Sequence, residues 1–188
     1  MTSPPRKICS YQVDAEFRIT LVAGDWAKFA VENAAPELAH PVSLRQRTLF
    51  SYIADEATRQ VYRAMFDRVA ARAKPITVPL RCDSPHVRRF LELTISPREG
   101  GGFHLDSSLL RTEPRPYLAL LDATHPRSHE LIRMCGWCKA VQVNEDWVEL
   151  EQGVEMLDLF GRNALPEIKH GVCKSCYAGL RENFGPHT

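Results

Sequence analysis

Apolar and polar residues alternate in two stretches near the start of the chain, which predicts a β-hairpin. The strands are expected at residues 7–13 and 17–22, around a tight turn at Asp14-Ala15. In the second strand Phe17, Ile19 and Leu21 alternate with polar residues, as in a strand with one buried face.

Three more strands are expected before residue 112. They lie at residues 76–80, 90–96 and 103–110, and three glycines at 100–102 supply the turn between the last two. Pro79 has no N–H to donate to a neighbouring strand. The strand that contains it is therefore expected at a sheet edge or interrupted.

A helical pattern separates the hairpin from these three strands. Asp55 stands at the cap position of a helix expected over residues 56–73, and Lys74-Pro75 stops it. A shorter helix is expected after Asp25. The long helix has one apolar stripe, formed by Val61, Tyr62, Met65, Phe66, Val69 and Ala70. Helices with one apolar face and an antiparallel sheet predict an α+β fold, with the helices on one face of the sheet.

This order of elements, with the segments DWAKFAVENAAPEL and RTLFSYIADEATRQVYRAMFDRV, resembles a PAS domain across residues 7–112. The resemblance implies a sensor of small ligands, cofactors or partners that often dimerises and acts on an attached output domain. No cofactor-binding residue of that family can be carried over. Five aromatic residues could line a ligand cavity or fill a core, and the core is favoured at this size: Trp26, Phe29, Phe50, Tyr52 and Phe66.

Prolines 114, 116 and 126 interrupt the pattern after the last of these strands. We therefore expect a PAS-like sensor domain at residues 1–112, a proline-containing connector at 113–130 and a separate module at 131–188. All paired cysteines lie in the last segment.

Two C-x-x-C pairs organise that module. Cys135 and Cys138 form the first pair, and Cys173 and Cys176 form the second, with 34 residues between Cys138 and Cys173. Zinc prefers four tetrahedral ligands, and two such loops supply four sulfurs with none left over. Strand segments flanking the first pair predict a zinc-ribbon-like unit, followed by a helical segment with Val154, Leu157 and Phe160. Because so small a module buries little surface, one structural Zn²⁺ would be coupled to its folding.

Other sites are compatible with parts of this pattern. A rubredoxin-like iron site uses the same four ligands, and His170 could replace one sulfur. A thioredoxin dithiol is disfavoured, because it needs a βαβ setting that is not apparent here. A c-type haem is also disfavoured, because it needs His after the second cysteine, where Lys139 stands. Cationic neighbours could offset the charge of four thiolates around zinc: Arg133, Lys139, Lys169, His170 and Lys174.

The tail also resembles a segment at the C-terminus of some bacterial PAS-containing signalling proteins. The elements that carry this resemblance are CGWCK, the Asp146-Trp147-Val148 stretch and HGVCKSC, within residues 131–182. No kinase, cyclase or helix-turn-helix output is expected within these 188 residues. The resemblance implies a signalling role without defining its biochemistry.

Composition and motifs narrow the function further. The formal net charge of +1 argues against wholesale binding to nucleic acid, and no segment has the roughly 20 apolar residues of a membrane helix. No secretory signal is recognised, so a cytoplasmic location is expected. No catalytic grouping is found, so we expect no enzyme.

Cys9 and Cys82 are interpreted as small buried apolar residues. Arg81, Arg88 and Arg89 are interpreted as part of a solvated loop, with anion binding as the alternative.

The sequence therefore predicts a non-enzymatic cytoplasmic, bacterial regulatory protein that acts through a protein partner. A homodimer through the PAS-like domain and a small-molecule PAS ligand are further expectations. Two alternatives stay open: a nucleic-acid-binding zinc-ribbon regulator, and a redox sensor that releases zinc when its cysteines oxidise.

Overall fold

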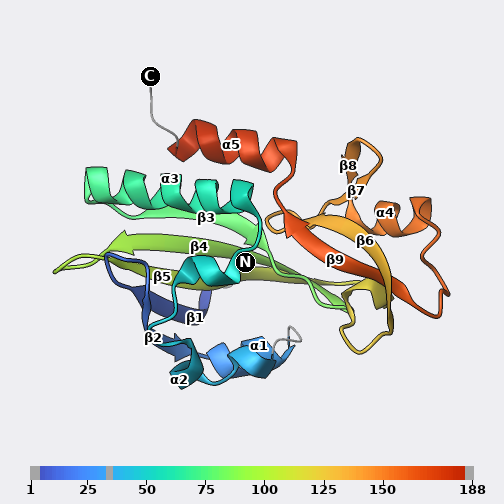
Figure 1. The fold of residues 1–188 in the computed structure, drawn as a ribbon, viewed down its shortest axis with the longest axis horizontal. Helices are drawn as coiled ribbons and strands as arrows, with labels where there is room; N and C mark the ends of the chain where they lie inside the picture. Colours follow the sequence, from blue (N-terminus) through green and yellow to red (C-terminus); the bar gives the residue numbers. More distant parts are fainter. Residues whose placement is uncertain (1–4, 33–35, 185–188) are drawn as a thin grey trace.

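The computed structural model describes residues 5–32 and 36–184, and it contains two β-sheets with helices packed around them (Figure 1). The first sheet is formed by β1 (Arg6–Val13), β2 (Ile19–Gly24), β3 (Ile76–Arg81), β4 (Val87–Pro97) and β5 (Phe103–Pro114). The second is formed by β6 (Arg127–Cys135), β7 (Val141–Val143), β8 (Asp146–Val148) and β9 (Leu165–Gly171). The expected α+β class is confirmed.

The helices fill the intervals between these strands. The α-helices are α1 (Trp26–Glu32), α2 (Pro41–Leu44), α3 (Glu56–Arg72), α4 (Leu150–Met156) and α5 (Lys174–Phe184). Short 3-10 turns are η1 (Pro36–Leu38), η2 (Leu49–Tyr52) and η3 (Ala119–Leu121). In the part of the chain that the structure describes, no helix combines the length and apolar character needed to cross a membrane.

The first sheet is antiparallel throughout and has the order β2-β1-β5-β4-β3. The chain thus starts at one side of the sheet, crosses to the other side through α3 and returns to pair β5 with β1. β3 lies at the edge, and Pro79 is paired there with Glu92 of β4. The predicted edge position of Pro79 is confirmed, because an edge strand needs only half of its backbone groups for the ladder.

The long helix α3 begins and ends as the sequence indicates, within one residue. The Asp55 carboxylate accepts a hydrogen bond from the backbone N–H of Thr58 at 2.7 Å, which caps the first turn. Ala73 has a φ of 49° and ends the helix in the left-handed conformation. The buried positions of the helix pack on the sheet: Val61, Met65, Phe66 and Val69.

The second sheet has the order β8-β7-β6-β9, in which β6 and β9 are parallel. In the same sheet, β7 is antiparallel to both β6 and β8. A separate apolar core lies against it, and this core includes Leu118 and Leu120 from the segment predicted as a connector, with Met134, Leu150 and Leu165. That segment therefore contributes to the packing of the tail.

Two details differ from the expectations. Phe17 stands before β2 with a φ of 60°, and its ring stacks on Phe103 within the core. Helix α4 begins at Leu150. The helix then stops at Met156, so Phe160, expected in its apolar stripe, is 62% exposed.

The two parts of the molecule share one core. Cys135, Trp137, Cys173 and Leu180 of the tail are buried in the same cluster as the inner side chains of α3 and the first sheet. The end of β3 is also hydrogen-bonded to the tail, from the Arg81 N–H to the Trp137 carbonyl at 2.7 Å. Helix α5 lies beside α3 (Figure 1). The tail therefore packs directly on the first sheet and its helix, along a contact that we call the seam.

Candidate metal centre

The first cysteine pair lies where β6 turns into β7. The Cys135 N–H donates to the Ala140 carbonyl at 2.8 Å, and the Lys139 N–H donates to the Cys135 carbonyl at 3.1 Å. Lys139 has a φ of 65°, which few residues other than glycine adopt without cost. These contacts close a tight loop around Gly136 and Trp137, and they hold both thiols on one side of the turn.

The second pair lies where β9 passes into α5. Cys173 directly precedes the helix, and Cys176 lies in its first turn, where the Tyr177 N–H donates to the Cys173 carbonyl at 2.9 Å. Since β6 and β9 are parallel neighbours, both cysteine pairs lie at the same edge of the sheet, where these two strands end. A hydrogen bond of 2.8 Å from the Gly136 N–H to the Gly171 carbonyl joins the two loops.

The four sulfur atoms form a compact group. The Sγ atoms of Cys135, Cys138, Cys173 and Cys176 all lie within 4.8 Å of one another. Cys138 Sγ and Cys173 Sγ, from different loops, are 3.7 Å apart. A tetrahedral site with Zn–S bonds of about 2.3 Å has sulfur–sulfur edges of about 3.8 Å. The group could therefore hold a metal ion.

Backbone amides point at these sulfurs. The Cys173 N–H donates to Cys135 Sγ, and the Cys176 N–H donates to Cys173 Sγ, each at 3.4 Å. The start of α5 adds the positive end of an 11-residue helix dipole. Both effects favour the thiolate form, which is the form that binds metal.

The thiols also interact with one another. Hydrogen bonds from Cys138 and Cys176 lower the pKa of Cys135, while the contact with Cys135 raises the pKa of Cys138 to about 12. The contacts with Cys135 and Cys138 raise the pKa of Cys176. A metal ion that takes all four sulfurs must displace the shared protons, so its affinity would rise with pH.

Two of the five cationic neighbours named from the sequence make contacts of their own in the structure. Lys139 Nζ donates to the Gly136 carbonyl at 3.0 Å, inside the first loop. The Arg133 guanidinium lies 5.9 Å from the ring centre of Trp147. Lys169, His170 and Lys174 are exposed. Among the described residues, the group that could hold a metal comprises the four cysteines without His170.

None of the six cysteines, all of which lie in the described part of the chain, forms a disulfide bond. Cys9 is buried, and burial raises the pKa of its thiol. Cys82 is partly buried, and burial raises its pKa as well. Both observations agree with the interpretation of these two residues as small apolar side chains outside the metal group.

The arginines at residues 81–89 belong to an ionic network that the sequence did not reveal. Arg81 and Arg115 both bind the Asp83 carboxylate, whose side chain is 0% exposed. Arg81 also reaches Glu149 at 2.8 Å, and Arg88 and Arg115 both bind Glu151. Arg89 donates its backbone N–H to Asp83 at 3.4 Å. The interpretation of Arg81 and Arg88 as a solvated loop was therefore wrong: both bind carboxylates at the start of α4, across the seam.

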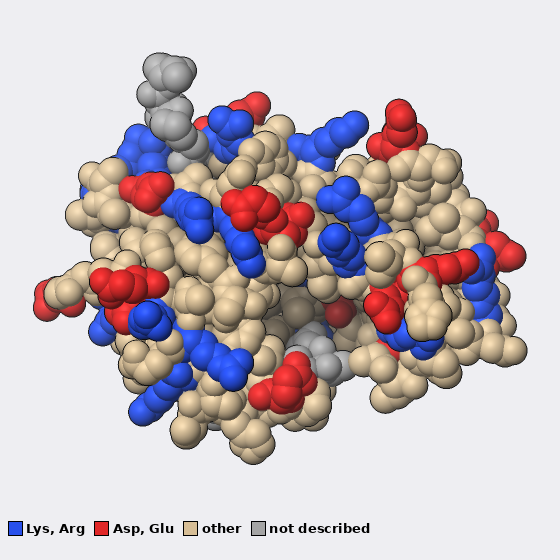
Figure 2. Space-filling model, in the orientation of Figure 1, with Lys and Arg blue, Asp and Glu red and all other residues tan. Residues whose placement is uncertain are grey.

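A cavity of about 520 Å³ lies in the seam beside the cysteine loops. Tyr62 of α3, Leu80 of β3, Trp137 of the first cysteine loop and Lys169 of β9 line it, together with Tyr52. Figure 2 shows this face of the molecule hollowed between its two parts. Of the aromatic residues weighed as cavity or core, Phe66, Phe50, Trp26 and Phe29 pack in the apolar clusters, while Tyr52 reaches the cavity.

Comparisons of this chain with known proteins found no relative. No protein-family model matches the chain, and neither the curated proteins nor the solved structures contain a match.

Proposed function

We propose that this chain is a non-enzymatic regulatory protein in which a PAS-like domain is joined to a structural four-cysteine zinc site. The observation that carries the proposal is the group of four sulfurs within 4.8 Å, contributed by two loops that both touch the first sheet's core. A closed set of four thiolates leaves no position for substrate, which is typical of structural rather than catalytic zinc.

The first sheet supports the PAS-like part of the proposal. Along the chain its elements are a hairpin, helices and three further strands, the order on which the resemblance was based, and all five strands form one antiparallel sheet. The tail provides an output surface fixed to this domain, because the two share one core. We infer that a change in the PAS-like domain is passed to a protein partner through the tail.

The nucleic-acid alternative finds less support. Arg81, Arg88 and Arg115 are neutralised by carboxylates within the protein, so they are not available to phosphates. The formal net charge of +1 points the same way. A protein partner is therefore the better proposal.

Metal content tests the proposal directly. We expect purified chain to hold one zinc per molecule, measured by elemental analysis, and Cys173→Ser to lose it together with a large part of its stability. Cys82→Ser is the matched control, because Cys82 lies outside the sulfur group. A wild-type chain that folds to the same stability with no metal would contradict the proposal.

A further inference from the structure

The seam cavity adjoins both loops that carry the sulfurs. Gly136 and Trp137, which line it, lie between Cys135 and Cys138 in the chain. On the other side Lys169, His170 and Gly171 line it just before Cys173. An occupant that fills the cavity would therefore touch both cysteine loops.

The inner wall of the cavity is aromatic and aliphatic. The rings of Tyr62 and Trp137 have centroids 5.5 Å apart and are inclined by 53°. Leu80 and Ile168 extend this surface, and Leu131, which is 66% exposed, lies at the cavity. A flat ring is the shape that such a surface accommodates best, since offset and edge contacts between aromatic rings add to apolar burial.

The charged groups at the cavity nearly balance. Asp55 and Glu167 contribute carboxylates, and Lys169 contributes an ammonium, with His170 beside it. The Asp55 carboxylate already accepts hydrogen bonds from the N–H and the hydroxyl of Thr58, at 2.7 and 2.8 Å. A ligand with a full charge of either sign would meet a like charge at the cavity, which favours an uncharged occupant.

Tyr62 is one of three residues with a hydroxyl group that line the cavity, together with Tyr52 and Thr58. Burial raises the pKa of Tyr62 to about 12, so the phenol stays protonated at neutral pH. It can therefore donate a hydrogen bond to a neutral acceptor or accept one from an N–H group.

We propose that the seam cavity binds a small, flat, uncharged aromatic molecule, and that its occupant holds the two cysteine loops together. This inference rests on the proposed function, because it makes the cavity the sensing site and the zinc loops the element that responds. The physical link is direct. Zinc that leaves this site must break its bonds to both loops, and an occupant that contacts Trp137 and Lys169–Gly171 opposes their separation.

Indole is a suitable probe, with indole-3-acetate and tryptamine as anionic and cationic counterparts. We expect titration calorimetry on zinc-loaded chain to show indole binding more tightly than either charged compound. Saturating indole should slow the transfer of zinc to a coloured chelator several-fold. Tighter binding of a charged counterpart, or an unchanged rate of zinc transfer, would overturn the inference.

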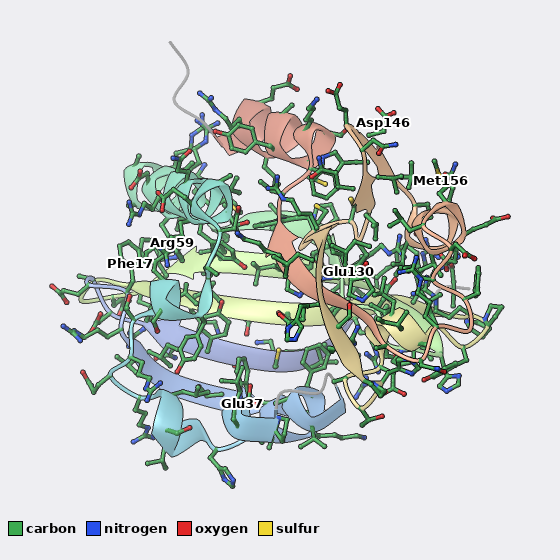
Figure 3. The ribbon with its side chains drawn as sticks, turned by 45° about the vertical axis from the view of Figure 1, so that its right-hand side comes forward. Phe17, Glu37, Arg59, Glu130, Asp146 and Met156 are labelled. Atoms are coloured by element: carbon green, nitrogen blue, oxygen red, sulfur yellow. The ribbon has the colours of Figure 1, made fainter. Side chains whose placement is uncertain are left out.

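A pair of variants locates the site. Leu131→Gln removes apolar surface at the cavity and should weaken indole binding about tenfold. Met156→Gln is the matched control: Met156 is also exposed, at 55%, Figure 3 shows it on α4, and it does not line the cavity. Equal binding by both variants would overturn the assignment to this cavity.

The two proposals fail in different ways. The zinc content of the same sample is measured first, and chain that folds without zinc contradicts the proposed function. Zinc-loaded chain that does not bind indole overturns only the further inference.

Discussion

A single carboxylate fixes the start of the helix that lies between the two parts of the molecule. Asp55 caps α3 through Thr58, and the same residue lines the seam cavity. Because the first N–H groups of a helix have no partners within it, an acceptor at this position stabilises the first turn.

Replacing Asp55 tests this role. Asp55→Ala should lower the free energy of unfolding by about 1 kcal/mol, since the Thr58 N–H loses its acceptor. Asp55→Asn keeps a side-chain oxygen and should lose much less. Urea unfolding of both variants provides the measurement, and equal stability of the alanine and asparagine variants would contradict the capping role.

At the scale of elements, the turn between β4 and β5 depends on glycine. Gly102, in the turn between β4 and β5, has a φ of +83°, and an added Cβ would lie 2.2 Å from the Val13 carbonyl oxygen. Gly100 has a similar φ of +81°, but an added Cβ there would meet no atom within 4 Å. The two glycines therefore separate backbone strain from a steric clash.

We expect Gly100→Ala to cost about 1–2 kcal/mol of stability, because only the left-handed backbone conformation opposes it. Gly102→Ala should cost clearly more, since β1 must also move away from the turn. Thermal or urea unfolding compares the two variants. A smaller loss for Gly102→Ala than for Gly100→Ala would show that the turn relaxes without disturbing β1.

The elements that the sequence predicted are those with a local signal. Alternation located β1, β4 and β5, and the Asp55 cap with one apolar stripe located α3. Strand β9 was missed because its sequence, LPEIKHG, does not alternate and contains a proline. It becomes a strand through parallel pairing with β6, in which Arg133 lies opposite Lys169.

The candidate site was predictable for a different reason. Four cysteines at the spacing of two C-x-x-C loops have few structural uses, so residue type alone indicated the group. The charged residues at the seam carry no such signal. Arg81 and Glu149 are 68 positions apart, and each resembles an ordinary surface charge until the fold brings them together.

At the scale of the whole molecule, the ionic network links the first sheet to the tail. Arg115, 1% exposed in its side chain, lies between Asp83 and Glu151, and Arg88 binds Glu151 from β4. Removing one partner from so buried a group leaves a charge without compensation, whereas exposed pairs contribute little. The network is therefore a second link across the seam, independent of the cysteines.

Glu151 makes this link depend on pH. Its burial opposes ionisation, but hydrogen bonds from Arg115 and Arg88 outweigh that effect and lower its pKa from 4.5 to about 2. A carboxyl whose pKa is lower in the folded state contributes stability above its unfolded pKa and loses it as the pH falls toward the folded value. The contribution of Glu151 should thus be complete above about pH 5 and decline from pH 4.5 to 2.

Glu151→Gln isolates this contribution. The variant should be less stable than wild type at pH 7, and the difference should shrink as the pH falls below 4.5, because protonated glutamate then resembles glutamine. Acid-driven loss of metal affects both proteins alike and cancels in the difference. Glu130→Gln is the matched control, since Glu130 forms an exposed pair with Arg162 at 3.2 Å, and it should change stability little at any pH. A difference for Glu151→Gln that stays constant from pH 7 to 3 would mean that this carboxylate does not hold the tail to the first sheet through its charge.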